Sequence, residues 1–494
     1  MRLTSNMKTL IWGALLCAGY ASAQSITNAG VQYVQTIPVP GWSVGKGSTD
    51  LFGFNPVTRI MYLADRTNHG VDVIDTHTQT IVGQIPFAAT TVLNYPLVAP
   101  DLQQLIVTDG LKSVYVFDLR TPVPGGQPDT YVMPGTTPDG MAYDTFNQTV
   151  YVVMDDAPYY LVGISLPQKK IVSQNLIPYS ADLIAFNPTD GKIYIAMEDA
   201  DHNNASAGVG VYDPATNTMS APAMYKIGPA CPGHGIDIDP VTNVAVMGCF
   251  SPGLVTGQVG INLTTGQAQI FSDVSGTDSI VFNPNLRRFY SGSGLNNTST
   301  SGCPALNGTA APKTVPILGV FDASAITLPD FAPGGMLDGV ACTGRGNHIA
   351  GVDPYTNNIY VPVSQYPADP ASATSGAAGL LLFHDTTKPA QTPYAQAIAN
   401  LAPIGGGAAA GTVHLSPDAS RRMLIQVSPT GVAGTSAQLT VSTTVTTELV
   451  PCTVSGGTAV CSQELLGDPL LGSVITLSVN EAAVASGVVT LGKF

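Results

Sequence analysis

The stretch LFGFNPVTRIMYLAD, residues 51–65, decides the fold. It reads as an apolar strand that ends at Asn55, an Asn-Pro turn, and a second apolar strand that ends at Asp65. Two strands joined by such a turn form a β-hairpin. The phrase returns, with weaker copies in the first two places, at residues 97–109, 141–155, 184–198, 236–248, 280–292 and 349–363. Repetition of one hairpin along a chain predicts a repeat architecture.

The spacing of the copies predicts which repeat architecture it is. The turn residue that ends the first strand of each copy, here named the anchor, is Asn55, Ala99, Asp144, Asn187, Asp239, Asn283 or Asp353. Successive anchors are 44, 45, 43, 52, 44 and 70 residues apart. A period near 44 is typical of a four-stranded β-propeller blade. We therefore predict an all-β, seven-bladed β-propeller, with insertions in the longer spacings.

Each copy continues with two further strands. GVDVIDTHTQTIVGQIP at 70–86 is a strand, a turn and a strand, and similar segments follow at 208–222 and 257–271. The last copy ends at LLLFHDTTK, residues 380–388, and so lacks an outermost strand. The segment VQYVQTIPVPG at 31–41 matches the missing piece. We expect this N-terminal strand to complete the last blade and close the ring, which removes exposed sheet edges.

These phrases resemble the YVTN/NHL family of bacterial propeller repeats. The resemblance covers about residues 31–386 and rests on N-P-x-T-x-x-I-Y, as in residues 353–360 with Asp in place of Asn, and on V-x-V-I/Y-D, as in residues 71–75. It implies the propeller fold. It does not choose a function, because propellers of this class include binding scaffolds, cell-surface proteins, lyases and lactonases.

The two ends of the chain differ from the repeats. Residues 1–23 have a basic start, a short apolar run and the small-residue site Ala21-Ser22-Ala23, which predicts a secretory signal peptide. No later segment has membrane-spanning length. We therefore expect an exported protein, periplasmic or extracellular, with the propeller at 24–390. Residues 396–494, rich in Ala, Gly, Ser, Thr and Val, alternate as strands do, and we expect a small immunoglobulin-like β-sandwich there.

Charge and cysteine content agree with export. The formal charge of −14 becomes −16 when the predicted signal peptide is removed, so a nucleic-acid backbone or an anionic membrane is excluded as a partner. Six cysteines remain, an even number that favours disulfides in an oxidising compartment. Cys452 and Cys461 flank a Gly-Gly turn, Cys231 and Cys249 are symmetric about the Pro240 turn, and Cys303 and Cys342 are left as a pair. Free buried thiols are the alternative.

One set of positions predicts chemistry. Five residues before each anchor the chain has a polar residue, and six of the seven are ionisable: Asp50, Asn94, Asp139, Asp182, His234, Asp278 and His348. The start of each innermost strand lies at the mouth of a propeller's channel, so we expect these side chains, here named the ring, to bind a ligand. Carboxylates so close together repel unless they are spaced, protonated or bound to a cation.

The candidate metal ligands are Asp182, His234, Asp278 and His348, and the candidate cofactor is calcium or a transition metal. Long insertions follow the second strands of the fourth, sixth and seventh copies, on the face where the ring is expected. Asp65, Asp109, Asp155 and Glu198 end second strands and are expected near that face. A ring that only holds water and caps the neighbouring loops is the alternative.

Three functions remain open. The first is an exported propeller that binds a small molecule, a saccharide or a protein through a cation. The ligand would lie in the funnel, the mouth of the central channel that the ring surrounds. The second is a metal-assisted lyase or lactone hydrolase, in which a ring residue moves a proton. The third is a surface or adhesion module without catalysis. Motifs for a zinc protease, a phosphate loop or a CxxC redox site are absent from the sequence.

Overall fold

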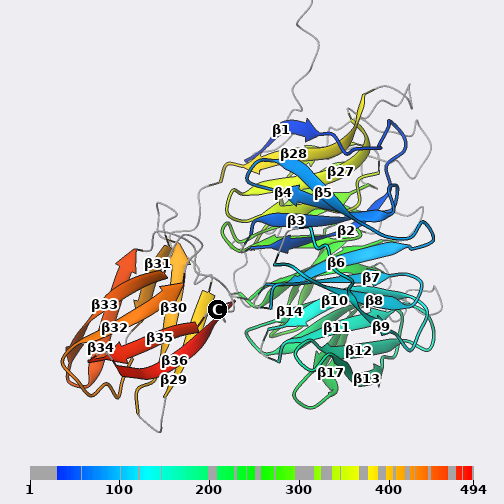
Figure 1. Cartoon of the computed structure of the whole chain (residues 1–494). Coiled ribbons are helices and arrows are strands. Elements are labelled where there is room, and N and C mark those ends of the chain that lie inside the picture. The colour runs from blue at the N-terminus through cyan, green and yellow to red at the C-terminus, as the bar shows by residue number, and fades with distance from the viewer. Residues whose placement is uncertain are drawn as a thin grey trace, which may run out of the picture.

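A computed structural model gives the fold. It describes residues 30–491 except 57, 101, 121–122, 146, 199–207, 227–230, 241, 251–256, 272–273, 295–315, 324–336, 345, 367–375, 388–396, 404–407, 418–422, 428, 443–446, 465–473 and 481. The described residues form strands joined by turns (Figure 1). No helix in these ranges is long and apolar enough to cross a membrane.

The repeats fold as antiparallel four-stranded sheets, seven of them in the described ranges, each in simple chain order except the last. The first three sheets comprise β2 (Thr49–Asn55), β3 (Ile60–Asp65), β4 (Gly70–Asp75) and β5 (Thr80–Pro86); β6 (Leu93–Ala99), β7 (Gln104–Asp109), β8 (Ser113–Asp118) and β9 (Asp129–Val132); and β10 (Pro138–Asp144), β11 (Thr149–Met154), β12 (Tyr160–Ser165) and β13 (Lys170–Leu176).

The next three sheets follow the same order. They comprise β14 (Ala181–Asn187), β15 (Lys192–Met197), β16 (Gly208–Asp213) and β17 (Thr218–Lys226); β18 (Gly233–Asp239), β19 (Val244–Cys249), β20 (Gln258–Asn262) and β21 (Ala268–Phe271); and β22 (Ile280–Asn283), β23 (Arg288–Ser293), β24 (Ile317–Asp322) and β25 (Leu337–Cys342).

The seventh sheet joins the two ends of the repeat region. Its order is β26 (Gly351–Asp353), β27 (Asn358–Tyr366), β28 (Ala377–Asp385) and then β1 (Val31–Ile37). β1 pairs antiparallel with β28, from Val31 opposite Asp385 to Ile37 opposite Leu380. The prediction that the N-terminal strand completes the last repeat is confirmed.

The first strands of the sheets contact one another in cyclic order, from β2 through β6, β10, β14, β18 and β22 to β26 and back to β2. Apolar residues of neighbouring sheets pack between them, for example Tyr62 on β3 against Val98 on β6. Innermost strands around a common axis, with apolar layers between twisted sheets, make a β-propeller-type fold.

The anchor turns explain why the phrase repeats. The residue four positions after each anchor has a left-handed backbone, with φ between 50° and 73°: Arg59, Gln103, Gln148, Gly191, Asn243, Arg287 and Asn357. Where the anchor is Asn or Asp, its side chain caps the turn, as Asn187 Oδ1 does by accepting the amide of Thr189 at 3.0 Å. An Asn or Asp followed by a residue that tolerates positive φ is therefore the local requirement of the hairpin.

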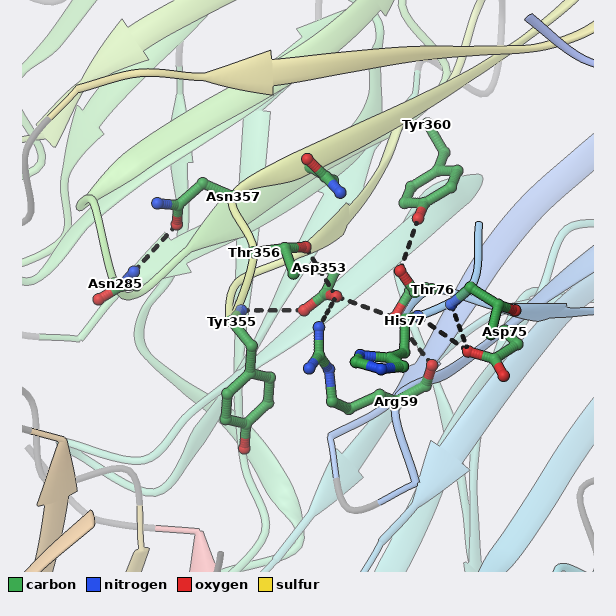
Figure 2. Close-up of polar contacts among 12 residues, drawn as sticks. Arg59, Asp75, Thr76, His77, Asn285, Asp353, Tyr355, Thr356, Asn357 and Tyr360 are labelled. Carbon is green, nitrogen blue, oxygen red and sulfur yellow. Dashed lines mark hydrogen bonds and ion pairs between the residues drawn. The ribbon is translucent and has the colours of Figure 1, made fainter. Parts of the chain in front are cut away.

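The same two turn positions tie each sheet to the next at four of the junctions. Anchor side chains contact the left-handed residue of the following sheet in the pairs Asn187–Asn243, Asp239–Arg287, Asn283–Asn357 and Asp353–Arg59. The last pair closes the cycle (Figure 2). There Asp353 Oδ2 accepts Arg59 Nη2 at 2.9 Å and the hydroxyls of Thr76 and Thr356 at 2.8 Å each.

The C-terminal strands form a separate group (Figure 1), with a core of their own that includes Leu439, Val450 and Leu477. They are β29 (Ala397–Pro403), β30 (Gly411–Pro417), β31 (Met423–Val427), β32 (Ala437–Ser442), β33 (Thr447–Ser455), β34 (Thr458–Glu464), β35 (Val474–Val479) and β36 (Ala482–Leu491). The expected two-sheet immunoglobulin-like sandwich is not confirmed. The strands pair as one closed barrel, because β29 pairs with both β30 and β36.

Two predicted disulfides are confirmed. Cys231 and Cys249 are bonded across the β18–β19 hairpin, with Cα atoms 4.8 Å apart, and Cys452 and Cys461 face each other on β33 and β34 at 4.2 Å. Cys342 is also disulfide-bonded. Its predicted partner, Cys303, lies outside the described residues.

Candidate functional site

The ring residues lie at one end of the innermost strands. Five ring residues are each the second residue of an innermost strand, β2, β6, β10, β14 or β18: Asp50, Asn94, Asp139, Asp182 and His234. Asp278 and His348 come just before β22 and β26. The structure brings them together, since their contacts and electrostatic interactions link sheets far apart in sequence. For example, burial raises the pKa of Asp50, and repulsion from Asp278 and Asp182, which belong to other repeats, contributes to the shift.

His234 is the centre of the cluster. Its Nδ1 contacts Asp182 Oδ2 and lies 3.4 Å from Asp278 Oδ1, and its Nε2 lies 2.8 Å from Glu198 Oε1. The imidazole and the ring of Phe250 pack edge to face, with ring centroids 5.2 Å apart. Burial opposes protonation of His234, but the three carboxylates outweigh it and raise its pKa well above the ordinary value.

Asp278 lies between the two histidines of the ring. Its Oδ1 faces His234, and its Oδ2 lies 3.8 Å from His348 Nε2. Two groups of potential metal ligands share it, Asp182–His234–Asp278 and Asp50–Asp278–His348, each with ligand atoms within 4.8 Å of one another. Burial opposes ionisation of Asp278, but the two imidazoles lower its pKa below the ordinary value. All four residues predicted as metal ligands therefore fall into these two groups.

The remaining ring carboxyls are held in unfavourable surroundings. Burial, then repulsion from other ring acids, raises the pKa of Asp139 well above the ordinary value. Burial likewise raises the pKa of Asp182 to about 7, although His234 opposes the shift. Burial also raises the pKa of Asp50, in spite of a nearby guanidinium. Protons or a cation therefore relieve strong repulsion at this end of the channel.

That guanidinium belongs to Arg66, which the sequence analysis missed. Its Nη2 donates to Asp50 Oδ2 and to Asn94 Oδ1, the latter at 2.6 Å, and its Nε donates to the carbonyl of Leu93 at 2.8 Å. Arg66 directly follows the second strand of its repeat, at the position where the third repeat has Asp155 and the fourth has Glu198. The sequence signal that could have identified Arg66 is a basic residue just after Asp65, at the end of the hairpin where the ring lies.

The four acids expected near this face divide into two pairs. Glu198 and Asp155 belong to the cluster through Ser180, whose hydroxyl lies 2.9 Å from Glu198 Oε2 and 2.8 Å from Asp155 Oδ1. A hydroxyl has one proton and donates to only one of them at a time. Burial raises the pKa of Asp155 to about 6.

Asp65 and Asp109 instead serve their own turns. Asp65 accepts the amides of Thr67 and Asn68 and the indole N–H of Trp42. Asp109 accepts the amides of Leu111 and Ser113 and the hydroxyl of Tyr115. Most of the three long insertions expected on this face lies outside the described residues.

Comparisons with known proteins establish the fold class. Similar chains occur in the solved structures titled "Kuenenia stuttgartiensis Hydrazine Synthase" and "Crystal Structure of Mitotic Checkpoint Complex". The first has a TM-score of 0.52 and 14% identity, and the match covers 67% of this chain and 96% of that one. The second has a TM-score of 0.50 and 10% identity, and the match covers 78% and 100%.

Both relatives are β-propeller-type proteins. This chain has a β-propeller-type fold. Identities this low carry the fold and nothing about activity. No protein-family model matches the chain, and no curated protein matches it. The YVTN/NHL resemblance stays a prediction.

Proposed function

We propose that the chain is an exported seven-bladed propeller, residues 24–390, followed by an independent C-terminal unit, residues 396–494. Seven sheets in cyclic contact and a separate hydrophobic core after residue 396 support this division. The disulfides support an oxidising compartment.

We further propose that the ring binds a divalent cation, which in turn holds a ligand in the funnel. The observation that carries this proposal is the position of Asp278, with one carboxylate oxygen facing each histidine of the ring. Each of the two groups that share Asp278 combines one imidazole with two carboxylates, which is a mixed nitrogen and oxygen donor set. Such a set favours a first-row transition metal over calcium, which prefers oxygen ligands alone.

The test is a double variant, His234→Ala/His348→Ala. The matched control is His77→Ala/His384→Ala, which removes two histidines from outside the ring: His77 is exposed beside Asp75 (Figure 2), and His384 contacts Asn358. Elemental analysis of the purified proteins and titration calorimetry with Zn²⁺, Mn²⁺ and Ca²⁺ give the readout. We expect wild type and control to bind one equivalent and the ring variant to bind none.

Equal metal content in ring variant and control would refute the cation site. The ring would then be a network of ion pairs and protonated acids that holds the strand ends together.

A metal-assisted lyase or lactone hydrolase is the second candidate. The pKa of Asp182 near 7, raised by burial, favours it, because a general base works best when its pKa is close to the working pH. In this mechanism the cation polarises a carbonyl or carboxylate of the substrate, and Asp182 takes up or returns a proton. A screen of lactones and uronate polymers tests it. Turnover that survives both a chelator and Asp182→Asn would exclude these roles.

A further inference from the structure

A cavity of about 470 Å³ lies directly beneath the ring. Its wall begins at the residues that follow ring positions, such as Leu51 and Leu183, and ends at the residues that follow the anchors, such as Pro56 and Pro354. It therefore runs along the innermost strands. Its volume lies within the range of small-molecule sites, about 300–1,000 Å³.

The wall is mainly apolar and strongly aromatic. Phe52, Phe54, Tyr95, Tyr143, Phe186 and Tyr355 line it, together with aliphatic side chains. Tyr355 belongs to the end opposite the ring, beside Arg59, whose guanidinium carbon is 5.6 Å from its ring centroid (Figure 2). A molecule that enters past Tyr355 reaches the cavity without crossing the charged ring.

Two of the polar residues in this wall lie on adjacent sheets. Asp237, on β18, is the one charged residue among the described residues that line the cavity. Its Oδ1 accepts the amide of Ile238 at 2.8 Å and its Oδ2 that of Phe282 at 2.7 Å, so the carboxylate is fixed in place. Each oxygen still has a lone pair for a further donor.

Ser279, just before β22, is the second group. It is 7% exposed, and within the described part of the chain its hydroxyl has no hydrogen-bond partner. A buried hydroxyl without a partner is unfavourable by about 1–3 kcal/mol, which a ligand that supplies the partner recovers.

We propose that the cavity binds an elongated organic cation, a primary ammonium on a hydrocarbon body. The ammonium donates to Asp237 and Ser279, and the hydrocarbon body packs along the apolar wall. Aromatic faces around a cation add cation–π attraction. A carboxylate in the wall repels an anion, and a neutral hydrocarbon leaves Ser279 without a partner. The net charge of −14 favours the approach of a cation. This site does not depend on the metal proposed for the ring.

The test uses three probes of equal length on the full chain: decylammonium, decanol and decanoate, each below its micelle concentration. Titration calorimetry should show decylammonium binding at least tenfold more tightly than decanol, and no binding of decanoate. Asp237→Asn should weaken decylammonium binding at least tenfold, and Ser279→Ala about threefold. Ala185→Phe, which places a ring in the cavity wall, should abolish binding of both decylammonium and decanol.

The ring variant His234→Ala/His348→Ala separates this proposal from the metal site, because it should keep full decylammonium affinity. Equal affinity for all three probes, or an Ala185→Phe variant that binds as wild type does, would overturn the proposal. Thermal melts identify any variant that fails to fold, and Ser279→Ala, which removes only an unpartnered hydroxyl, then decides the role of the polar wall.

Discussion

Arg66 shows how one side chain balances the ring. It donates to Asp50 and Asn94 and brings a fixed positive charge to a cluster of acids. Under the proposed function it competes with a cation for Asp50. We predict that Arg66→Gln raises divalent cation affinity about tenfold, the equivalent of roughly 1.4 kcal/mol, and lowers the melting temperature in the absence of metal.

Calorimetric titration of this variant provides the measurement. Arg120→Gln is the control, because it removes a guanidinium whose partner, Asp118, is a surface residue. Equal affinity in Arg66→Gln and wild type would show that Asp50 takes no part in binding the cation.

Asp72 predicts how stability depends on pH. It is 3% exposed, Gln84 donates to its Oδ1 at 2.9 Å, and its Oδ2 has no partner among the described residues. Burial, then repulsion from Asp65, raises its pKa to about 8. The folded protein therefore binds more protons than the unfolded chain between about pH 4 and pH 8, so this group makes stability fall as pH rises through that window.

Asp72→Asn should remove that fall. We predict that at pH 9 the variant is more stable than wild type by about 2 kcal/mol or more, while at pH 4 the two differ little. Denaturant unfolding at both pH values measures this, with exposed Asp129→Asn as the control. A variant that loses stability equally at both pH values would show that Asp72 acts only through packing.

At the scale of single residues, the position of a residue along its repeat could be predicted from sequence, whereas the partners of its side chain could not. Counting five residues back from each anchor finds all seven ring positions, because repeated hairpins place equivalent residues at equivalent heights. Counting forward from the anchors separates the four acids as well. Asp155 and Glu198, which join the cluster, lie 11 residues after their anchors, whereas Asp65 and Asp109, which cap their own turns, lie 10 residues after theirs. Arg66 lies 11 residues after Asn55, at the position of Asp155 and Glu198, and was missed because that position was not counted in register.

The anchor turns govern stability at the scale of the element. Asp353 is fully buried and accepts Arg59, Thr76 and Thr356 at the junction between the seventh and first sheets (Figure 2). Asp353→Ala leaves a half-buried guanidinium without its carboxylate. We predict a loss of about 3 kcal/mol in unfolding free energy, measured by denaturant unfolding.

Asp118→Ala serves as the control, since it removes an acid from a surface pair with Arg120. A loss below about 1 kcal/mol for Asp353→Ala would mean that the apolar layers between sheets, and not the anchor contacts, close the cycle.

Sequence predicted that each anchor caps its own turn. It did not predict which residue of the next sheet the anchor contacts. Asn-Pro and Asp-Pro indicate a turn because the side chain bonds the next amides. The partner of Asp353 lies 294 residues away and is defined only once the cycle has closed. Strand order in the C-terminal barrel is similar: alternation predicts β31, β32 and β35, but not that β32 pairs with β35.

The whole molecule has two sets of hydrophobic cores. The C-terminal cluster uses residues between Ala399 and Ala485 alone. We therefore predict two separate thermal transitions. Cys452→Ser/Cys461→Ser should lower one of them, because a disulfide that closes a loop of about ten residues contributes roughly 2–3 kcal/mol. Cys231→Ser/Cys249→Ser should lower the other.

Scanning calorimetry of the two variants measures this. A single transition that both variants shift together would show that the propeller and the barrel unfold as one unit. Sequence composition indicated the boundary near residue 396, since the repeat phrase stops and small residues take over. The sequence pattern could not distinguish a two-sheet sandwich from a closed barrel, because the strands of both folds bury every second side chain.

The pairing of β1 with β28 has a consequence for topology. Val31, where the described chain enters the propeller, lies opposite Asp385, near where it leaves. The chain therefore enters at residue 31 and leaves after residue 385 on the two neighbouring outer strands of a single sheet. A tether that begins at either point would hold the propeller through this one sheet.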